Sequence, residues 1–331
     1  MERYPIDLVV TWVDGNDKEW QREKAEALGI TNGDDRIIRY RDWDIMKYWF
    51  RGVEECLPFI NRIHFITWGH LPEFLNVNHE KLNIIKHTDY IPSEYLPTFN
   101  SNVIELNLHR IEDLAEHFIL ANDDFFFLKR VKEDFFFKKG LPRDAALQNV
   151  LQFHKSGGIG HIMANDLEWL NKKYSKRSVM LKNFSKWFNL KYGIKALYNL
   201  YLLPFSNFTG FDDPHIPFSY LKSEWEDLWN ESGEALDKIC RNKLRDSSDI
   251  NHWLMRYRQM AKGKFCPANY KRGEFYIIGE DDEKIKNAVL GKKVPMACFS
   301  DDNVDIDFEK EKEFLKEILE KRFPNKSKFE L

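Results

Sequence analysis

The stretch Phe118-Ile-Leu-Ala-Asn-Asp-Asp-Phe-Phe-Phe127 decides how we interpret this chain. Its apolar run ends abruptly at Asn122, and a short apolar run bounded by polar residues is typical of a buried β-strand. In open α/β sheets, ligands bind beyond the carboxyl ends of the strands. Asp123 and Asp124 would stand at such an end, where paired carboxylates can hold a divalent cation such as Mg²⁺ or Mn²⁺. A simple turn also uses Asn and Asp, so these residues alone leave both interpretations open.

Strand and helix patterns alternate on the amino-terminal side of that stretch. Residues 6–13 are rich in β-branched side chains, and residues 62–67 and 82–85 are further short apolar runs. We therefore expect three buried strands, followed by a helix over residues 101–111. Strands and helices that alternate at these spacings predict parallel β/α units with right-handed crossovers. The expected fold class is α/β, with a mostly parallel, open, Rossmann-like sheet flanked by helices.

Residues that could take part in catalysis or ligand binding also occur after this stretch. His215 lies between two prolines, a rigid setting that would suit proton transfer, although a lone histidine is most often structural. Arg245 stands beside a cluster of helix-capping residues. Residues 293–299 predict a late strand that ends close to Asp301 and Asp302, a second pair of carboxylates.

Composition limits the class of protein. The 331 residues carry a net charge of -3, which argues against a polyanion-binding protein and against a nucleic-acid partner. The four cysteines form no CxxC pair, so we expect reduced thiols and a cytoplasmic protein. No uninterrupted apolar run is long enough to span a bilayer. The expected protein is soluble, or at most peripheral at the inner face of the cell membrane.

Residues 171–205 have an unusual composition. They include eight Lys or Arg and no Asp or Glu, with aromatic side chains interleaved. Such a segment can lie on an anionic membrane surface or hold a polyanionic acceptor. It can also be an ordinary basic helical face with a buried apolar side. We therefore divide the chain into an amino-terminal α/β half (1–145), a helical insertion (146–206) and a second part that completes the core (207–331).

Four separated blocks resemble the signature regions of the Stealth family, which are sugar-phosphate transferases of capsular polysaccharide synthesis. The animal enzyme that adds N-acetylglucosamine phosphate to lysosomal glycoproteins is a relative of that family. The blocks are residues 6–17; residues 39–42 with Arg51, 96–102, 104–105, 109–111 and 118–124; residues 215–217 with Arg245; and residues 297–302.

The resemblance implies a fold like that of the type A glycosyltransferases and a specific reaction. Hexose-1-phosphate would move from a nucleotide sugar, UDP-N-acetylhexosamine, to a hydroxyl of a growing capsular or cell-surface polysaccharide, or of a lipid-linked glycan. UMP would be released. One alternative is a metal-dependent glycosyltransferase that releases UDP. A second alternative is a non-catalytic module that binds nucleotides or carbohydrates.

The resemblance also implies a role for each candidate residue. His215 would be the general base, with His109 as its rival, and Arg245 would bind phosphate oxygens. Asp123 would be both a catalytic residue and a ligand of the Mg²⁺ (or Mn²⁺) ion. The cation ligands would be Asp123, Asp124, Asp301 and Asp302. The remaining candidates would contact the nucleotide sugar: Thr11, Trp12, Asp14, Gly15, Arg39, Arg51, Asn100, Ser101 and Arg110.

Overall fold

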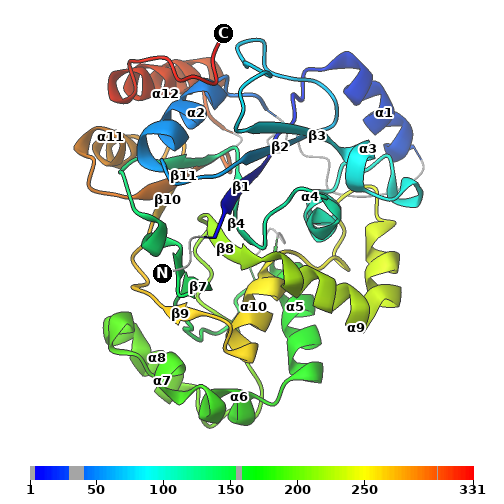
Figure 1. Cartoon of the computed structure of the whole chain (residues 1–331), viewed down its shortest axis with the longest axis vertical. Helices are drawn as coiled ribbons and strands as arrows, with labels where there is room; N and C mark the ends of the chain where they lie inside the picture. The colour runs from blue at the N-terminus through cyan, green and yellow to red at the C-terminus, as the bar shows by residue number, and fades with distance from the viewer. Residues whose placement is uncertain (1–3, 30–40, 154–158, 304) are drawn as a thin grey trace.

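A five-stranded sheet in the order β3-β2-β1-β4-β8 forms the centre of the structure (Figure 1). This computed structural model describes residues 4–29, 41–153, 159–303 and 305–331. Strands β3, β2, β1 and β4 run parallel, and β8 pairs with β4 in the antiparallel direction. The predicted α/β class with a mostly parallel, open sheet is confirmed. The strands are β1 (Ile6–Thr11), β2 (Ile63–Thr67), β3 (Leu82–Lys86), β4 (His117–Asn122) and β8 (Phe218–Leu221).

Two smaller sheets extend this core. After β4 the chain turns at Asp123 and Asp124 and then enters a second sheet, in which β11 lies between β10 and β5. A third, short sheet has the order β6-β7-β9. The bounds are β5 (Phe125–Phe127), β10 (Glu274–Ile277) and β11 (Met296–Ser300) in the second sheet, and β6 (Phe137–Lys138), β7 (Leu141–Asp144) and β9 (Cys266–Pro267) in the third.

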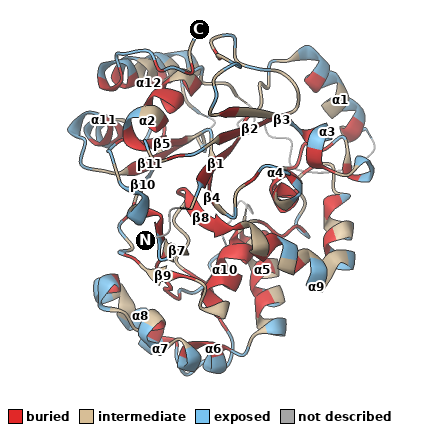
Figure 2. Cartoon of the chain, in the orientation of Figure 1, coloured by how far each residue is buried: buried red, intermediate tan, exposed pale blue. Residues whose placement is uncertain are grey.

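Helices pack around the sheets, and Figure 2 shows the central strands buried among them. Gly52 lets α2 approach β5 closely, because a Cβ at this position would lie 2.9 Å from the carbonyl oxygen of Phe127. The helices are α1 (Lys18–Leu28), α2 (Met46–Cys56), α3 (His87–Tyr90), α4 (Ser101–Leu106), α5 (Gly160–Lys173), α6 (Lys176–Lys182), α7 (Phe184–Trp187), α8 (Ala196–Tyr201), α9 (Lys222–Cys240), α10 (Trp253–Lys262), α11 (Asp282–Gly291) and α12 (Phe308–Arg322). Short 3₁₀ helices are η2 (Ser93–Tyr95), η3 (Leu108–Arg110), η4 (Glu133–Phe135) and η5 (Leu190–Lys195).

Capping side chains explain where several helices begin and end. Asp17 accepts a hydrogen bond from the backbone N–H of Trp20 at 2.8 Å and so caps α1. The helix predicted over residues 101–111 is shorter in the structure, because α4 ends at Leu106. Asn107 follows it and donates its side-chain N–H to the carbonyl of Val103 at 2.9 Å, which replaces the backbone hydrogen bond that this carbonyl would receive if the helix continued.

The sequence did not predict β8 or the separate second sheet. Strand β8 has only four residues and follows Pro217 directly, so its short apolar run carries little periodicity. The late strand over residues 293–299 was predicted and corresponds to β11, but it lies beside β5 rather than in the central sheet. Helices α5 to α8 fall within the predicted insertion, residues 146–206. The division into three parts stays a prediction.

Candidate active site

Strand register brings the acidic turns to one edge of the molecule. Thr11 of β1 pairs with Asn122 of β4 in parallel register, so the turns that follow both strands leave the sheet together. Strand β11 reaches the same place, because the backbone N–H of Phe299 donates to the carbonyl of Asp124 at 3.0 Å. The carboxylates after β4 and those after β11 therefore meet, as the sequence predicts for Asp124 and Asp302: the charge of Asp302 acts on Asp124.

The direction of β8 adds His215 to this edge. Phe218 at the start of β8 pairs with Leu120 near the end of β4, and the two strands are antiparallel. The residues that precede β8 therefore run past the carboxyl end of β4. His215 Nε2 lies 3.9 Å from the Oδ2 atom of Asp124. The structure thus joins two candidates that are 91 residues apart in the sequence (215 minus 124).

Asp124, His215 and Cys298 form the centre of the site. One ligand atom from each of the three lies within 4.8 Å of the others. The thiol of Cys298 donates to Asp124 Oδ2 at 3.2 Å. The other oxygen of Asp124, Oδ1, is buried and has no hydrogen-bond partner among the described residues. A buried acceptor without a partner is costly unless a ligand satisfies it, so Asp124 Oδ1 fits a cation ligand.

The ionisation of these groups reflects crowding of like charge. Burial raises the pKa of Asp124 to about 7, and the Asp123 carboxylate adds to this shift. Desolvation raises the pKa of Asp123 to about 6, and the charge of Asp42 adds to it. The Asp123 side chain is exposed to solvent. Burial raises the pKa of the Cys298 thiol, so Cys298 is a hydrogen-bond donor rather than a thiolate ligand.

Aromatic rings surround the imidazole of His215. The ring centroids of Phe125 and Phe275 lie 4.9 and 6.0 Å from that of His215. Burial among them lowers the pKa of His215 to about 4, while the charge of Asp302 opposes this shift. The side chain nevertheless remains 35% exposed. At neutral pH the imidazole is therefore uncharged, accessible and able to accept a proton.

A buried ion network holds the loop that carries His215. Arg256 of α10 donates two hydrogen bonds to Asp144, at 2.6 and 2.9 Å, and it also donates to Asp213. The hydroxyl of Tyr257 donates to Asp213 at 2.5 Å. Burial opposes the charge of Arg256, but both carboxylates outweigh it and raise its pKa. Because Asp213 is two residues from His215, this network fixes the position of the histidine.

Asp301 and Asp302, the second pair of predicted cation ligands, have different partners. Asp301 forms a two-point ion pair with Arg41, whose Nε lies 2.8 Å from Asp301 Oδ2. That pairing leaves Asp301 less available to a cation. Asp302 accepts a hydrogen bond from the hydroxyl of Ser300 at 2.8 Å, and its side chain is exposed.

Arg245 lies near the same group of residues. Its charge acts on His215, and its guanidinium donates to the hydroxyl of Ser101 at 2.5 Å. Asn100 fixes the Arg245 loop, since its amide donates to Leu244 O at 3.1 Å and to Asp249 Oδ2 at 2.7 Å. Asn100 is fully buried, so it positions Ser101 and Arg245 from behind.

The end of β1 and the turn after it contain four of the nine predicted nucleotide-sugar contacts. Thr11 ends the strand, Trp12 is buried and Asp14 begins the turn that contains Gly15. The backbone N–H of Asp14 donates to Nε2 of His70 at 2.7 Å, a contact between the ends of β1 and β2 that the sequence did not predict. The negative charge of Asp14 contributes to a raised pKa of Asp42, and the charge of Asp42 contributes in the same way to the raised pKa of Asp123.

Three predicted residues lie away from this group. His109 feels the charge of Lys222, which bonds to Glu116 just before β4 begins. His109 is thus near the end of β4 that is opposite to Asp123, and a strand of six residues is about 20 Å long. Arg110 packs over the ring of Trp229, at 4.7 Å.

Arg51 has a structural environment. Its guanidinium donates to Glu330 at 2.8 Å and to the carbonyl of Phe323 at 2.7 Å, and it lies 3.2 Å from Glu320. These contacts fasten α2 to the carboxyl-terminal end of the chain. Arg39, a further predicted phosphate contact, lies outside the described residues.

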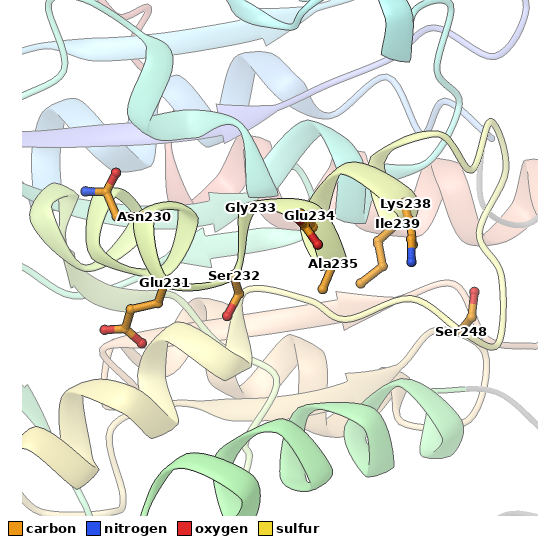
Figure 3. A pocket seen from close by; sticks show the side chains of 9 residues that line it. All are labelled: Asn230, Glu231, Ser232, Gly233, Glu234, Ala235, Lys238, Ile239 and Ser248. Atoms are coloured by element: carbon orange, nitrogen blue, oxygen red, sulfur yellow. The ribbon is translucent and has the colours of Figure 1, made fainter.

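An open groove of about 750 Å³ lies along α9, and Figure 3 shows the side chains that line it. Its lining runs from Asn230 to Ile239 of α9 and includes Ser248. The helix is interrupted there, because Ser232 has a non-helical backbone (φ -143°, ψ 25°). The predicted site residues are absent from this lining, so the groove is separate from the candidate active site.

The sheet is open and mostly parallel, and acidic side chains, a neutral histidine and an arginine lie at its carboxyl edge. This arrangement is typical of α/β enzymes that bind ligands at that edge. Comparison with known sequences gives the family. Residues 4–31 match the region described as "Stealth protein CR1, conserved region 1", and residues 39–144 match "Stealth protein CR2, conserved region 2".

Relatives cover the whole length of the chain. "Capsular polysaccharide phosphotransferase WcwK" of Streptococcus pneumoniae is 42% identical over 98% of this chain and 98% of its own length. "Exopolysaccharide phosphotransferase cps2G" of Lactiplantibacillus plantarum is 36% identical over 99% of this chain and 96% of its own. The chain therefore belongs to the Stealth family, as the motifs predict, and it is a transferase enzyme.

One solved structure is similar at a much lower sequence identity. It is the galactosyltransferase LgtC in complex with donor and acceptor sugar analogs, with 10% sequence identity and a TM-score of 0.39. The similarity extends over 97% of this chain and 98% of that one.

Proposed function

We propose that this protein transfers hexose-1-phosphate from UDP-N-acetylhexosamine to a hydroxyl of a capsular or cell-surface polysaccharide. UMP is the second product. The observation that carries the proposal is the pairing of Asp124, with its unsatisfied oxygen, and a neutral, accessible His215 at the carboxyl edge of the sheet. Membership in the Stealth family supports the proposal, as do relatives that match over nearly their full length and are named capsular polysaccharide or exopolysaccharide phosphotransferases.

In the proposed reaction the acceptor hydroxyl oxygen attacks the β-phosphorus of the nucleotide sugar. The bond between this phosphorus and the oxygen that bridges to the α-phosphate breaks, and UMP leaves with that oxygen. The proton of the acceptor hydroxyl goes to Nε2 of His215. His109 is too remote from Asp124 to take this role, so we assign the base to His215.

Carboxylate oxygens at the same edge are proposed to bind Mg²⁺ or Mn²⁺. We assign the ligands to Asp123, Asp124 and Asp302, because Asp301 is already paired with Arg41. When bound, the cation would neutralise charge on the diphosphate. Oxygen ligands favour Mg²⁺, and a nearby imidazole also makes Mn²⁺ acceptable.

Basic and polar groups are proposed to hold the donor around this centre. Arg245, which Ser101 orients, is placed to contact phosphate oxygens. The turn after β1, with Asp14 and Gly15, is proposed to contact the nucleotide. The acceptor is a polysaccharide or a lipid-linked glycan, and the protein would act at the cytoplasmic face of the membrane.

Identification of the products tests the proposal directly. The full chain is incubated with a panel of nucleotide sugars, an acceptor glycan and Mg²⁺ or Mn²⁺, and the products are read by mass. UMP together with an acceptor that has gained hexose and phosphate is expected. UDP together with an acceptor that has gained hexose alone would identify a glycosyltransferase instead. Binding of a nucleotide sugar with no turnover in either metal would identify a non-catalytic module.

A further inference from the structure

Large apolar side chains gather on the surface of the helical insertion. Of the 17 that are exposed among the described residues, ten lie between Leu181 and Phe205. Leu190 is 98% exposed, Ile194 77% and Tyr201 75%. Soluble proteins expose single apolar side chains routinely, but a large contiguous group marks a surface that binds something. We call the region of α6, α7, η5 and α8 the insertion surface; Figure 1 shows it at the edge of the molecule.

This exposure is built into the fold of the insertion. Trp187 is fully buried and stacks on Phe208, with ring centroids 5.4 Å apart. The buried side chain of Asn199 accepts from Gln148 N at 2.8 Å and donates to the carbonyls of Ala146 and Trp187, both at 2.7 Å. The segment is therefore anchored from within, and its outward apolar side chains are held in place rather than left loose.

The charged side chains of residues 171–205 are all basic, although Lys172 and Lys195 pair with Glu168 and Asp212 outside that range. Residues 171–205 carry eight basic side chains and no acidic one, while the whole chain has a net charge of -3. Arg177, Lys182 and Lys191 are exposed around the apolar group. Each basic side chain close to an anionic membrane contributes about 1 kcal/mol to binding. A soluble polyanion would satisfy these charges but would leave the leucines and Ile194 in water.

Among the described residues, no helix combines the length and the apolar character that crossing a membrane requires. Short amphipathic helices with a basic border instead lie in the interface, with their apolar side chains among the acyl chains. We infer that the insertion surface docks on an anionic lipid bilayer. This inference deepens the proposed function, on which it rests for one point: a docked enzyme would meet a lipid-linked acceptor at the membrane.

Vesicle sedimentation tests the inference without any substrate. The full chain is mixed with vesicles of phosphatidylcholine alone or with vesicles in which about a third of the phosphatidylcholine is replaced by the anionic phosphatidylglycerol. We expect binding to the anionic vesicles, weaker binding to neutral ones and loss of affinity as salt is raised. A chain that stays in the supernatant with anionic vesicles would overturn the inference.

Two variants with matched controls locate the contact. Leu190→Ser/Ile194→Ser/Tyr201→Ser is expected to lower affinity for anionic vesicles at least tenfold, because three apolar side chains no longer enter the interface. Val77→Ser/Leu290→Ser/Leu331→Ser removes exposed apolar side chains elsewhere and should bind normally. Equal affinities for the two triple variants would refute the assignment.

The charge variant is Arg177→Gln/Lys182→Gln/Lys191→Gln. It should weaken binding to anionic vesicles only, whereas Lys129→Gln/Lys132→Gln/Lys238→Gln, at exposed sites elsewhere, should not. Circular dichroism confirms that each variant is folded. UMP release with a water-soluble acceptor, measured on the same samples, separates the two proposals: the apolar variant keeps this activity if docking and chemistry are distinct.

Discussion

Two acidic clusters in this molecule differ in how their charge is compensated. Around Arg256, the carboxylates of Asp144 and Asp213 are both bonded to the guanidinium, and Tyr257 donates a further hydrogen bond. Around Asp124, the carboxylate receives a thiol hydrogen bond, and its second oxygen has no partner among the described residues. The first cluster is fully paired within the protein, whereas the second leaves a carboxylate oxygen without a hydrogen-bond partner among the described residues.

The difference separates structural from functional charge. A buried carboxylate that is paired stabilises a fixed arrangement, while one that is not paired costs stability and persists where function requires it. Substitutions at Arg256 should therefore act on stability, and substitutions at Asp124 should act on activity. His215 connects the two clusters: it is two residues from Asp213 of the first, and it lies 3.9 Å from Asp124 of the second.

The largest effect is expected when the positive charge of Arg256 is removed from between Asp144 and Asp213. Arg256→Met leaves Asp144 and Asp213 buried without compensation, so we expect the free energy of unfolding to fall by about 3–5 kcal/mol. Urea denaturation measures this change. The triple variant Arg256→Met/Asp144→Asn/Asp213→Asn removes the stranded charges and should regain a large part of the loss. A triple variant no more stable than the single one would contradict this account.

Loss of the histidine should remove catalysis while leaving the fold intact. His215→Ala is expected to lower kcat by about 10²–10⁴-fold, because the proposed acceptor of the hydroxyl proton is lost. His109→Gln is the control, since His109 lies toward the opposite end of β4, and its activity should stay within about threefold of the unmodified protein. Comparable losses in both variants would remove the distinction between the two histidines.

Removing the charge of Asp124 should separate activity from stability. Asp124→Asn keeps the shape of the side chain but removes the charge, so the transfer rate should fall by about 10²–10³-fold. Because that charge is uncompensated in the folded protein, Tm measured with a chelator present should be unchanged or higher. A clear drop in Tm would mean that Asp124 is structural in the way that Asp213 is.

The smallest effect is expected at Arg245. Its guanidinium is proposed to make one charge-assisted contact with phosphate, so Arg245→Gln should lower kcat/KM by about 10- to 100-fold. Lysine at this position keeps the charge and loses the fork of donors, and it should recover part of the activity. If glutamine and lysine behaved alike at full activity, the phosphate contact would be absent.

Local patterns predicted the parts of this arrangement that depend on neighbouring residues. The change from apolar to acidic after Ala121 is visible in the sequence, and the strand does end there. Cys298 was missed, although a signal was present: in a strand, residues two apart share a face, which places Cys298 and Ser300 together before Asp301.

Contacts between distant segments could not be read from local patterns. The pairing of Asp301 with Arg41 spans 260 residues, and that of Arg51 with Glu330 spans 279. An arginine suited to phosphate and an arginine that fastens two helices look the same in a sequence. The proximity of His215 to Asp124 was expected only through the family resemblance, because it depends on the direction of β8.

The antiparallel pairing of β8 with β4 has a consequence for how this enzyme can be altered. Asp124 stands in the turn after β4 and His215 lies shortly before β8, so the ladder of backbone bonds between these two strands sets their spacing. Helices α6 to α8, which come between β7 and the loop of His215, take no part in that ladder. The length or the target of these helices could therefore be redesigned while Asp124 and His215 keep their separation.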